Sequence, residues 1–168
     1  MRPGRRAFFG LTLAAIFLIA GCAQPERAIK EFGSEKQFWQ GRLALRIDSD
    51  NPQSFSAAFE LSGNAQSGAL VLSSPLGSTL AALSWTPDTA VMRANGELRR
   101  FGSLDELLRQ ATGAALPIAA LFAWLGGDQA TAPGWLADLT QLGTGRLTAR
   151  RTTPLPEVEL RLVLEPAS

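Results

Sequence analysis

The stretch FWQGRLALRIDSDNPQSFSAAFEL, residues 38–61, decides the fold because its apolar and polar side chains alternate in two runs separated by a turn. Alternation with a period of two places one face of a strand in the core and the other in water. Residues 38–47 and 54–61 both show this pattern, and residues 50–52 between them, Asp-Asn-Pro, have the composition of a turn. The stretch therefore predicts two antiparallel strands that share one apolar face.

The same alternation continues toward the C-terminus. Further strands are predicted over residues 68–74, 79–85, 89–94 and 97–101. The last two flank Asn95-Gly96, a strong hairpin signal because both residues tolerate a positive φ. We therefore expect six antiparallel strands in a row.

From residue 103 onward the apolar residues recur with the spacing of a helix instead of a strand. Ser103 and Glu106 have the spacing of a capping box, and this helix is expected to end at Gly113. A second helix is predicted from near Pro117, a residue tolerated in a first turn, to residues 126–127. Nearly all of its side chains are apolar, so it must be buried or cover an apolar surface.

The end of the chain returns to strands. Residues 146–151 and 158–165 are predicted to form a final hairpin, whereas residues 136–142 show no clear pattern. The fold class is mainly β, a strongly curved antiparallel sheet with a helical insertion. Periodicity alone does not separate a filled core from an apolar pocket under the two helices, so both remain open here.

Residues 1–21 are typical of a signal peptide. Three arginines precede an apolar run, residues 8–20, that is shorter than the ~20 residues needed to span a bilayer. Residues 19–22, Ile-Ala-Gly-Cys, resemble the lipobox cut by the lipoprotein signal peptidase. We expect cleavage before Cys22, lipidation of Cys22, a tether with a short helix over residues 22–37 and a folded domain over 38–168.

The expected anchor also predicts a location. A multiply acylated N-terminus holds a protein stably on a membrane. Ala23 stands where an aspartate would resemble the inner-membrane retention signal, so the outer membrane, facing the periplasm, is expected. Arg5-Arg6 resembles a twin-arginine export signal, although adjacent arginines are common in ordinary signal peptides; we favour the general secretory route, and both routes remain open.

Composition excludes most catalytic chemistry. The chain contains no histidine and no tyrosine, and Cys22 is its one cysteine. His-based acid–base catalysis, Ser-His-Asp and Cys-His nucleophiles and zinc sites of His or Cys are therefore excluded. Residues 22–168 hold thirteen basic and fifteen acidic residues, a net charge of −2, which does not favour a nucleic-acid partner. We therefore expect that the protein is not an enzyme and that it binds neither a metal ion nor a cofactor.

One loop is unusual. Residues 74–79, Ser-Pro-Leu-Gly-Ser-Thr, join two predicted strands and place Leu76 between the turn residues Pro75 and Gly77. A single loop leucine most often packs back into the core, which is the interpretation that pattern alone favours. The alternative is an exposed apolar tip that enters a bilayer or docks on a partner.

Several of these motifs together resemble the LolB family of outer-membrane lipoprotein receptors. The loop 75–79 is similar to the family's protruding loop, and residues 41–44, Gly-Arg-Leu-Ala, resemble its first strand. Thr112-Gly113, Leu116-Pro117, Leu121 and residues 124–126 match its helical segment in order and spacing. The resemblance covers most of residues 38–127. The family usually has further strands after the position of Trp135, where residues 136–145 are short here.

The resemblance implies a half-open antiparallel β-barrel with an apolar cavity covered by helices. A monomeric LolB-like protein would accept lipoproteins from a soluble LolA-like periplasmic carrier and release them into outer-membrane lipids. It implies that Pro75, Leu76 and Gly77 form the membrane-insertion loop. The inward-facing positions predicted to line the acyl cavity are Leu43, Leu45, Phe55, Phe59, Leu70, Leu72, Ile118, Leu121, Phe122 and Trp124.

Two other functions compete with this expectation. A lipid-anchored structural or assembly lipoprotein would have a filled β core and would bind no acyl chains. A lipid-modifying enzyme would need a catalytic group, and the sequence offers no convincing one.

Overall fold

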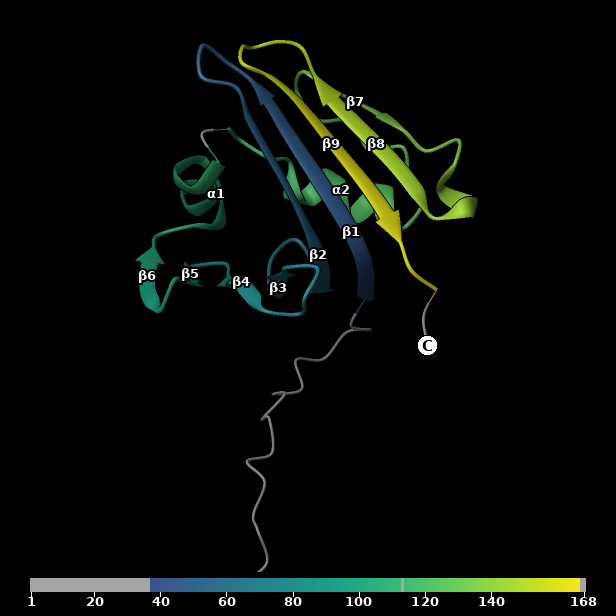
Figure 1. Cartoon of the computed structure of the whole chain (residues 1–168). Helices are drawn as coiled ribbons and strands as arrows, with labels where there is room; N and C mark the ends of the chain where they lie inside the picture. The colour runs from purple at the N-terminus through teal and green to yellow at the C-terminus, as the bar shows by residue number, and fades with distance from the viewer. Residues whose placement is uncertain (1–36, 113, 167–168) are drawn as a thin grey trace, which may run out of the picture. The chain divides into compact units, whose positions relative to one another are not determined.

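The computed structural model describes residues 37–112 and 114–166. Nine strands form one sheet in the order β6-β5-β4-β3-β2-β1-β9-β8-β7, and all neighbours in it are antiparallel (Figure 1). The strands are β1 (Gln37–Asp48), β2 (Gln53–Gly63), β3 (Gly68–Ser73), β4 (Thr79–Thr86), β5 (Thr89–Ala94), β6 (Glu97–Phe101), β7 (Trp135–Asp138), β8 (Arg146–Arg151) and β9 (Glu157–Leu164). The six strands predicted in a row are confirmed, as is the final hairpin.

That hairpin pairs with the first strand rather than continuing from β6. β9 lies against β1, with Leu43 opposite Leu162 and Leu45 opposite Leu160. Gly41 permits the close approach, since a Cβ atom there would lie 2.0 Å from the carbonyl oxygen of Val163. The first strand and the last strand of the chain are therefore neighbours in the interior of the sheet.

Two helices connect β6 to β7 and lie on the same side of the curved sheet (Figure 1). In α1 (Leu104–Thr112), Ser103 Oγ accepts a hydrogen bond of 3.1 Å from the Glu106 amide. The Glu106 carboxylate accepts one of 3.0 Å from the Gly102 amide, so the capping box forms with its carboxylate one residue further back. The second helix, α2 (Ile118–Leu125), follows Pro117 as expected.

The core lies between the helices and the concave face of the sheet. Its largest fully buried side chains are Trp124 on α2, Leu107 on α1 and Leu147 on β8. All core residues, including those partly buried, fall between Trp39 and Leu164. Because residues 33–168 form a compact unit that contains this whole core, they make up a folding unit of their own.

The segment without a clear pattern contains a short edge strand. Residues 136–142 include most of β7, and a single 3-10 turn, η1 (Leu142–Thr144), follows it. Within the described residues the sheet does not close, because β6 and β7 are its two edges. The architecture is thus an open, curved antiparallel sheet with two helices on its concave side. No helix within the described ranges has the length and apolar content needed to cross a membrane.

Candidate functional site

The loop between β3 and β4 is a tight three-residue turn. The Gly77 amide donates a 2.9 Å hydrogen bond to the Ser74 carbonyl, and the Ser74 amide donates one of 2.8 Å to the Ser78 carbonyl. Ser74 Oγ accepts a third, of 3.2 Å, from the Ser78 amide. Gly77 has a φ of +82°, the left-handed conformation that closes a type I turn into a hairpin of this length. The backbone of the loop is therefore fixed by its own hydrogen bonds.

This turn presents Leu76 to solvent. The side chain of Leu76 is 94% exposed, the highest value among the large apolar residues that the structure describes as exposed. The interpretation favoured by pattern alone, in which Leu76 packs into the core, is wrong. The physical reason is that the hydrogen-bonded turn holds residues 75–77 beyond the ends of β3 and β4, where all three are exposed.

The second part of the site is the apolar concave face. Four predicted lining residues are buried there in the core, and five are partly buried against it. The buried ones are Leu45, Phe59, Phe122 and Trp124, and the partly buried ones are Leu43, Leu70, Leu72, Ile118 and Leu121. Phe55 shares this face, since it pairs directly with Leu45, but it lies near the start of β2 and is 41% exposed.

Phe122 is one of the residues through which α2 packs on the sheet. Its ring packs edge-on against Trp39 of β1 at a centroid distance of 5.6 Å and against Trp85 of β4 at 6.3 Å. Neither tryptophan was among the predicted lining residues. The alternation along the strand could have identified them: Trp39, for example, lies on the same face of β1 as Leu43 and Leu45. The interior between α2 and the sheet is thus aromatic as well as aliphatic.

Polar groups at the rim of the interior hold the helical insertion in place. Trp124 Nε1 donates a 2.7 Å hydrogen bond to the carbonyl of Ala130, just beyond α2. Arg151, only 6% exposed, donates to the carbonyl of Ala115 (3.3 Å), in the α1–α2 connection, and to that of Pro156 (3.1 Å), in the β8–β9 loop. Through Arg151, these bonds tie the α1–α2 connection to β8 and to the β8–β9 loop.

Two hollows, of about 350 and 360 Å³, open on the outer, convex face of the sheet around Arg46, Glu159 and Arg161. At the edge strand β7, the Thr140 hydroxyl donates a 2.6 Å hydrogen bond to Asp138, and this bond, with one from the Thr140 amide, lowers the pKa of the Asp138 carboxyl.

The expected lipidation site Cys22, the signal peptide and the tether up to residue 36 fall outside the described residues.

Comparison of the sequence with known proteins points to one family. The sequence model of a family described as "Outer membrane lipoprotein LolB" matches residues 36–153. A protein named outer-membrane lipoprotein LolB from Dechloromonas aromatica is 33% identical over 118 residues, which are 67% of this chain and 62% of that protein. The relative of the same name from Cupriavidus pinatubonensis is 34% identical over 142 residues, 82% of this chain and 68% of the relative. The chain thus spans about two thirds of the length of these relatives. A third, from Bordetella petrii, is 28% identical over 172 aligned positions, 88% of this chain and 86% of its own length.

Proposed function

The chain belongs to the LolB family, and from that premise we propose that it receives lipoproteins at the outer membrane and inserts them into it. Its relatives are named outer-membrane lipoproteins, which supports a lipid-anchored location on that membrane through Cys22. The cargo would come from a LolA-like periplasmic carrier. Its acyl chains would be held between α2 and the concave face of the sheet, and no covalent step is required.

The observation that carries the proposal is the exposure of Leu76. Moving a leucine side chain from water into an apolar phase is worth about 1.5–3 kcal/mol, and Leu76 is held in water by a turn that cannot fold it inward. A bilayer is the apolar phase available to a membrane-anchored domain. We assign Pro75, Leu76 and Gly77 to contact with the membrane during delivery of the cargo.

The concave face supports the binding half of the proposal. Each methylene of an acyl chain kept from water is worth about 0.8 kcal/mol, so acyl chains move between proteins only through apolar interiors. α2 is apolar on nearly every side, and Ile118 and Leu121 are only partly buried against the core. If α2 shifted away from Trp39 and Trp85, an acyl chain could lie between them, with apolar surface of the helix on one side and of the sheet on the other.

The test separates acceptance of cargo from its delivery. A carrier loaded with an acylated lipoprotein is mixed with the segment 33–168, first alone and then with liposomes. The wild-type segment should take the cargo and release it into liposomes. The Leu76→Glu variant should take the cargo equally well and deliver it poorly. Leu155→Glu is the matched control, because Leu155 is also a highly exposed loop leucine, at 77%, and should deliver normally.

Two results would oppose the proposal. No cargo on a demonstrably folded wild-type segment would leave a lipid-anchored structural protein with a filled core as the better account. Equal delivery by the Leu76→Glu and Leu155→Glu variants would remove the loop from the mechanism.

A further inference from the structure

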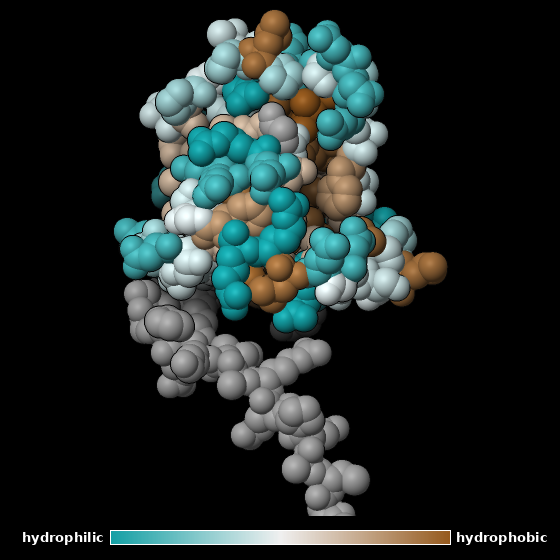
Figure 2. Space-filling model, turned by 90° about the vertical axis from the view of Figure 1, so that its left-hand side faces the viewer, coloured by the Kyte–Doolittle hydropathy of each residue, from teal (hydrophilic) through white to brown (hydrophobic). Residues whose placement is uncertain are grey.

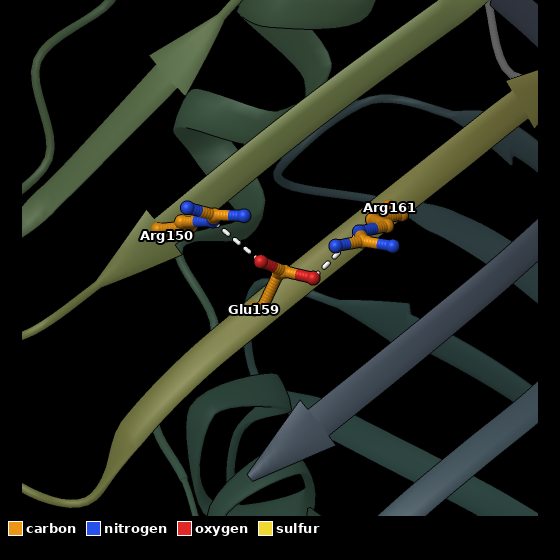
Figure 3. Close-up of polar contacts among 3 residues, drawn as sticks. All are labelled: Arg150, Glu159 and Arg161. Carbon is orange, nitrogen blue, oxygen red and sulfur yellow. Dashed lines mark ion pairs between the residues drawn. The ribbon is translucent and has the colours of Figure 1, made fainter. Parts of the chain in front are cut away.

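The outward, convex face of the sheet differs between its two halves. On β8, β9 and β1 it is mostly charged, and Glu159 forms ion pairs there with Arg150 and Arg161 (Figure 3). On β3 to β6 it combines aliphatic residues with serines and threonines, although the solvated face of an antiparallel sheet is commonly polar. We call this second surface the aliphatic face. Its aliphatic residues are Ala69, Val71, Leu80, Ala82, Val91 and Leu98.

Strand register arranges the aliphatic face in two rows. The row nearer the start of β4 consists of Val71, Ala82, Arg93 and Leu98. The other row consists of Ala69, Ser84, Val91 and Arg100. Within the described part of the chain, none of the six aliphatic residues belongs to the hydrophobic core or packs against it. They therefore point to the outside of the sheet.

The row that contains Leu98 lies near the end of the sheet from which Leu76 projects. The loop that carries Leu76 joins β3 to β4, and a tight turn joins β5 to β6. Both connections lie at the same end, because Ala94, the last residue of β5, is paired with Ala81 near the start of β4. β6 is two strands away from β4 in the sheet, which is about 10 Å. Leu98 is therefore a near neighbour of the loop in space.

A β-bulge holds Leu80 outward directly after the loop. In the pairing with β3 the register passes from Thr79 to Ala81, so Leu80 is an extra residue in β4. Leu80 is 38% exposed, and Leu98 is 43% exposed. Two leucines beside the loop thus lie at the surface instead of in the core.

Charge does not distinguish this surface. Arg93 and Arg100 are the charged residues of the two rows. Two carboxylates offset them, Glu60 on the neighbouring strand β2 and Glu97 at the start of β6. Figure 2, which views the molecule from the side of β6, shows apolar residues among polar ones at the lower rim of the domain. An apolar phase is therefore the partner that these side chains fit.

We propose that the aliphatic face lies on the bilayer when the loop that carries Leu76 enters it, so that Leu76, Leu80 and Leu98 form one membrane contact. The inference rests on the proposed function, which places that loop in the membrane. A bilayer is the occupant because the face is continuous with the loop, since Leu80 is the second residue of β4. Arg93 and Arg100 fit such a surface, because a long cationic side chain keeps its stem against apolar groups and its charge in water.

A wider contact fixes the orientation of the domain. A single inserted leucine leaves the domain free to turn about one point, and its transfer into an apolar phase is worth only about ten- to a hundredfold in binding. Contacts on two further positions of the sheet set its plane against the bilayer. The cargo is then released from a domain of defined orientation.

The experiment measures co-sedimentation of the segment 33–168 with vesicles of phosphatidylethanolamine and phosphatidylglycerol. The test variant is Leu80→Ser/Leu98→Ser, and Leu76→Glu is measured beside it. The matched control is Leu136→Ser/Val163→Ser, which removes two aliphatic side chains, 80% and 46% exposed, from the charged half of the outward face. Circular dichroism verifies that each variant is folded.

The exposed parts of Leu80 and Leu98 together amount to a little less than one leucine side chain, so the test variant should bind vesicles about tenfold more weakly. The control should stay within about twofold of the wild type, and added salt should change the wild-type affinity little. No vesicle binding by the wild type, equal losses in test and control variants, or loss of wild-type binding in salt would overturn the proposal. Slower uptake of cargo by the test variant without lipid would overturn it in favour of a carrier-docking surface.

A second measurement does not depend on removing the leucines. The segment 33–168 contains no cysteine, so an environment-sensitive dye can be attached to the Leu98→Cys variant and, as the control, to the Leu136→Cys variant. On vesicles, the emission of the dye should shift to the blue at position 98 and stay unchanged at position 136. Equal shifts at both positions, or none at position 98, would overturn the proposal.

The variants also separate this inference from the proposed function. Normal vesicle binding by Leu80→Ser/Leu98→Ser with weak binding by Leu76→Glu would overturn the aliphatic face and leave the loop in the mechanism. The opposite pair of results would uphold the aliphatic face as a membrane contact and refute the role of Leu76.

Discussion

Truncating Phe122 to alanine is expected to weaken the fold and at the same time strengthen binding of an acyl chain. The ring of Phe122 fills the space between Trp39 and Trp85, with centroid distances of 5.6 and 6.3 Å. Replacement of a buried phenylalanine by alanine costs about 3–5 kcal/mol. For a domain of this size that loss corresponds to a fall in Tm of roughly 10–20 °C.

The same truncation leaves apolar volume where we place the acyl chain. Two or three methylene groups that enter it would contribute about 2 kcal/mol, or about a thirtyfold gain in affinity for a long-chain fatty acid. Thermal unfolding followed by circular dichroism gives the stability. Titration with the fatty acid, followed by tryptophan fluorescence, gives the affinity, since Trp39 and Trp85 border the vacated space.

Phe101→Ala is the matched control for this prediction. Phe101 is 8% exposed in the same core but lies on β6, and among the described residues its ring forms no aromatic pair with Trp39 or Trp85. Its truncation should lower the Tm comparably and leave fatty-acid affinity unchanged. If neither variant gains affinity although both lose stability, α2 is part of a permanent core, and the reasoning that places acyl chains beneath it is refuted.

Gly41→Ala should destabilise the domain by several kcal/mol, because a Cβ atom there would lie 2.0 Å from the Val163 carbonyl oxygen. The control Gly143→Ala has open space around it and should change the free energy of unfolding in urea by less than about 1 kcal/mol. Equal losses in the two variants would contradict the assigned β1–β9 packing. Asp138 has a lowered pKa in the folded state because of Thr140, so its contribution to stability is present above the pKa of the unfolded chain and is lost as pH falls through the folded pKa. An NMR titration should give Asp138 a pKa below that of an ordinary aspartate. In the Thr140→Ala variant the pKa of Asp138 should rise toward the ordinary value, and an unchanged pKa would exclude the Thr140 hydroxyl as the cause.

Much of the fold could be predicted from local pattern. Alternation fixed the parity of each strand, so the side chains of β1 and β2 on the concave face could be assigned before any pairing was known. Asn95, whose φ is +52°, and Gly96 form the tight turn that their residue types indicate. Ser103 caps α1 through the bond that its spacing with Glu106 predicts.

Features that depend on contacts distant in sequence could not be predicted. Nothing in the alternation of β9 says that it pairs with β1, so the second neighbour of β1 in the sheet could not be assigned from the sequence. The exposure of Leu76 depends on backbone hydrogen bonds within its turn, and residue type alone favours burial there. The four residues of β7 are too few for a clear period of two, which is why this edge strand was missed.

The central claim is that acyl chains of a lipoprotein cargo lie between α2 and the concave face of the sheet. The most direct measurement uses cargo whose acyl chains carry bromine atoms, which quench tryptophan fluorescence on contact. Single-tryptophan variants would report on Trp39 and Trp85 separately, and Leu155→Trp in a chain without other tryptophans, at an exposed loop position, is the comparison. We expect cargo transferred from the carrier to quench Trp39 and Trp85 strongly and the tryptophan at position 155 weakly. Stoichiometric binding of cargo without quenching of Trp39 or Trp85 would contradict the account.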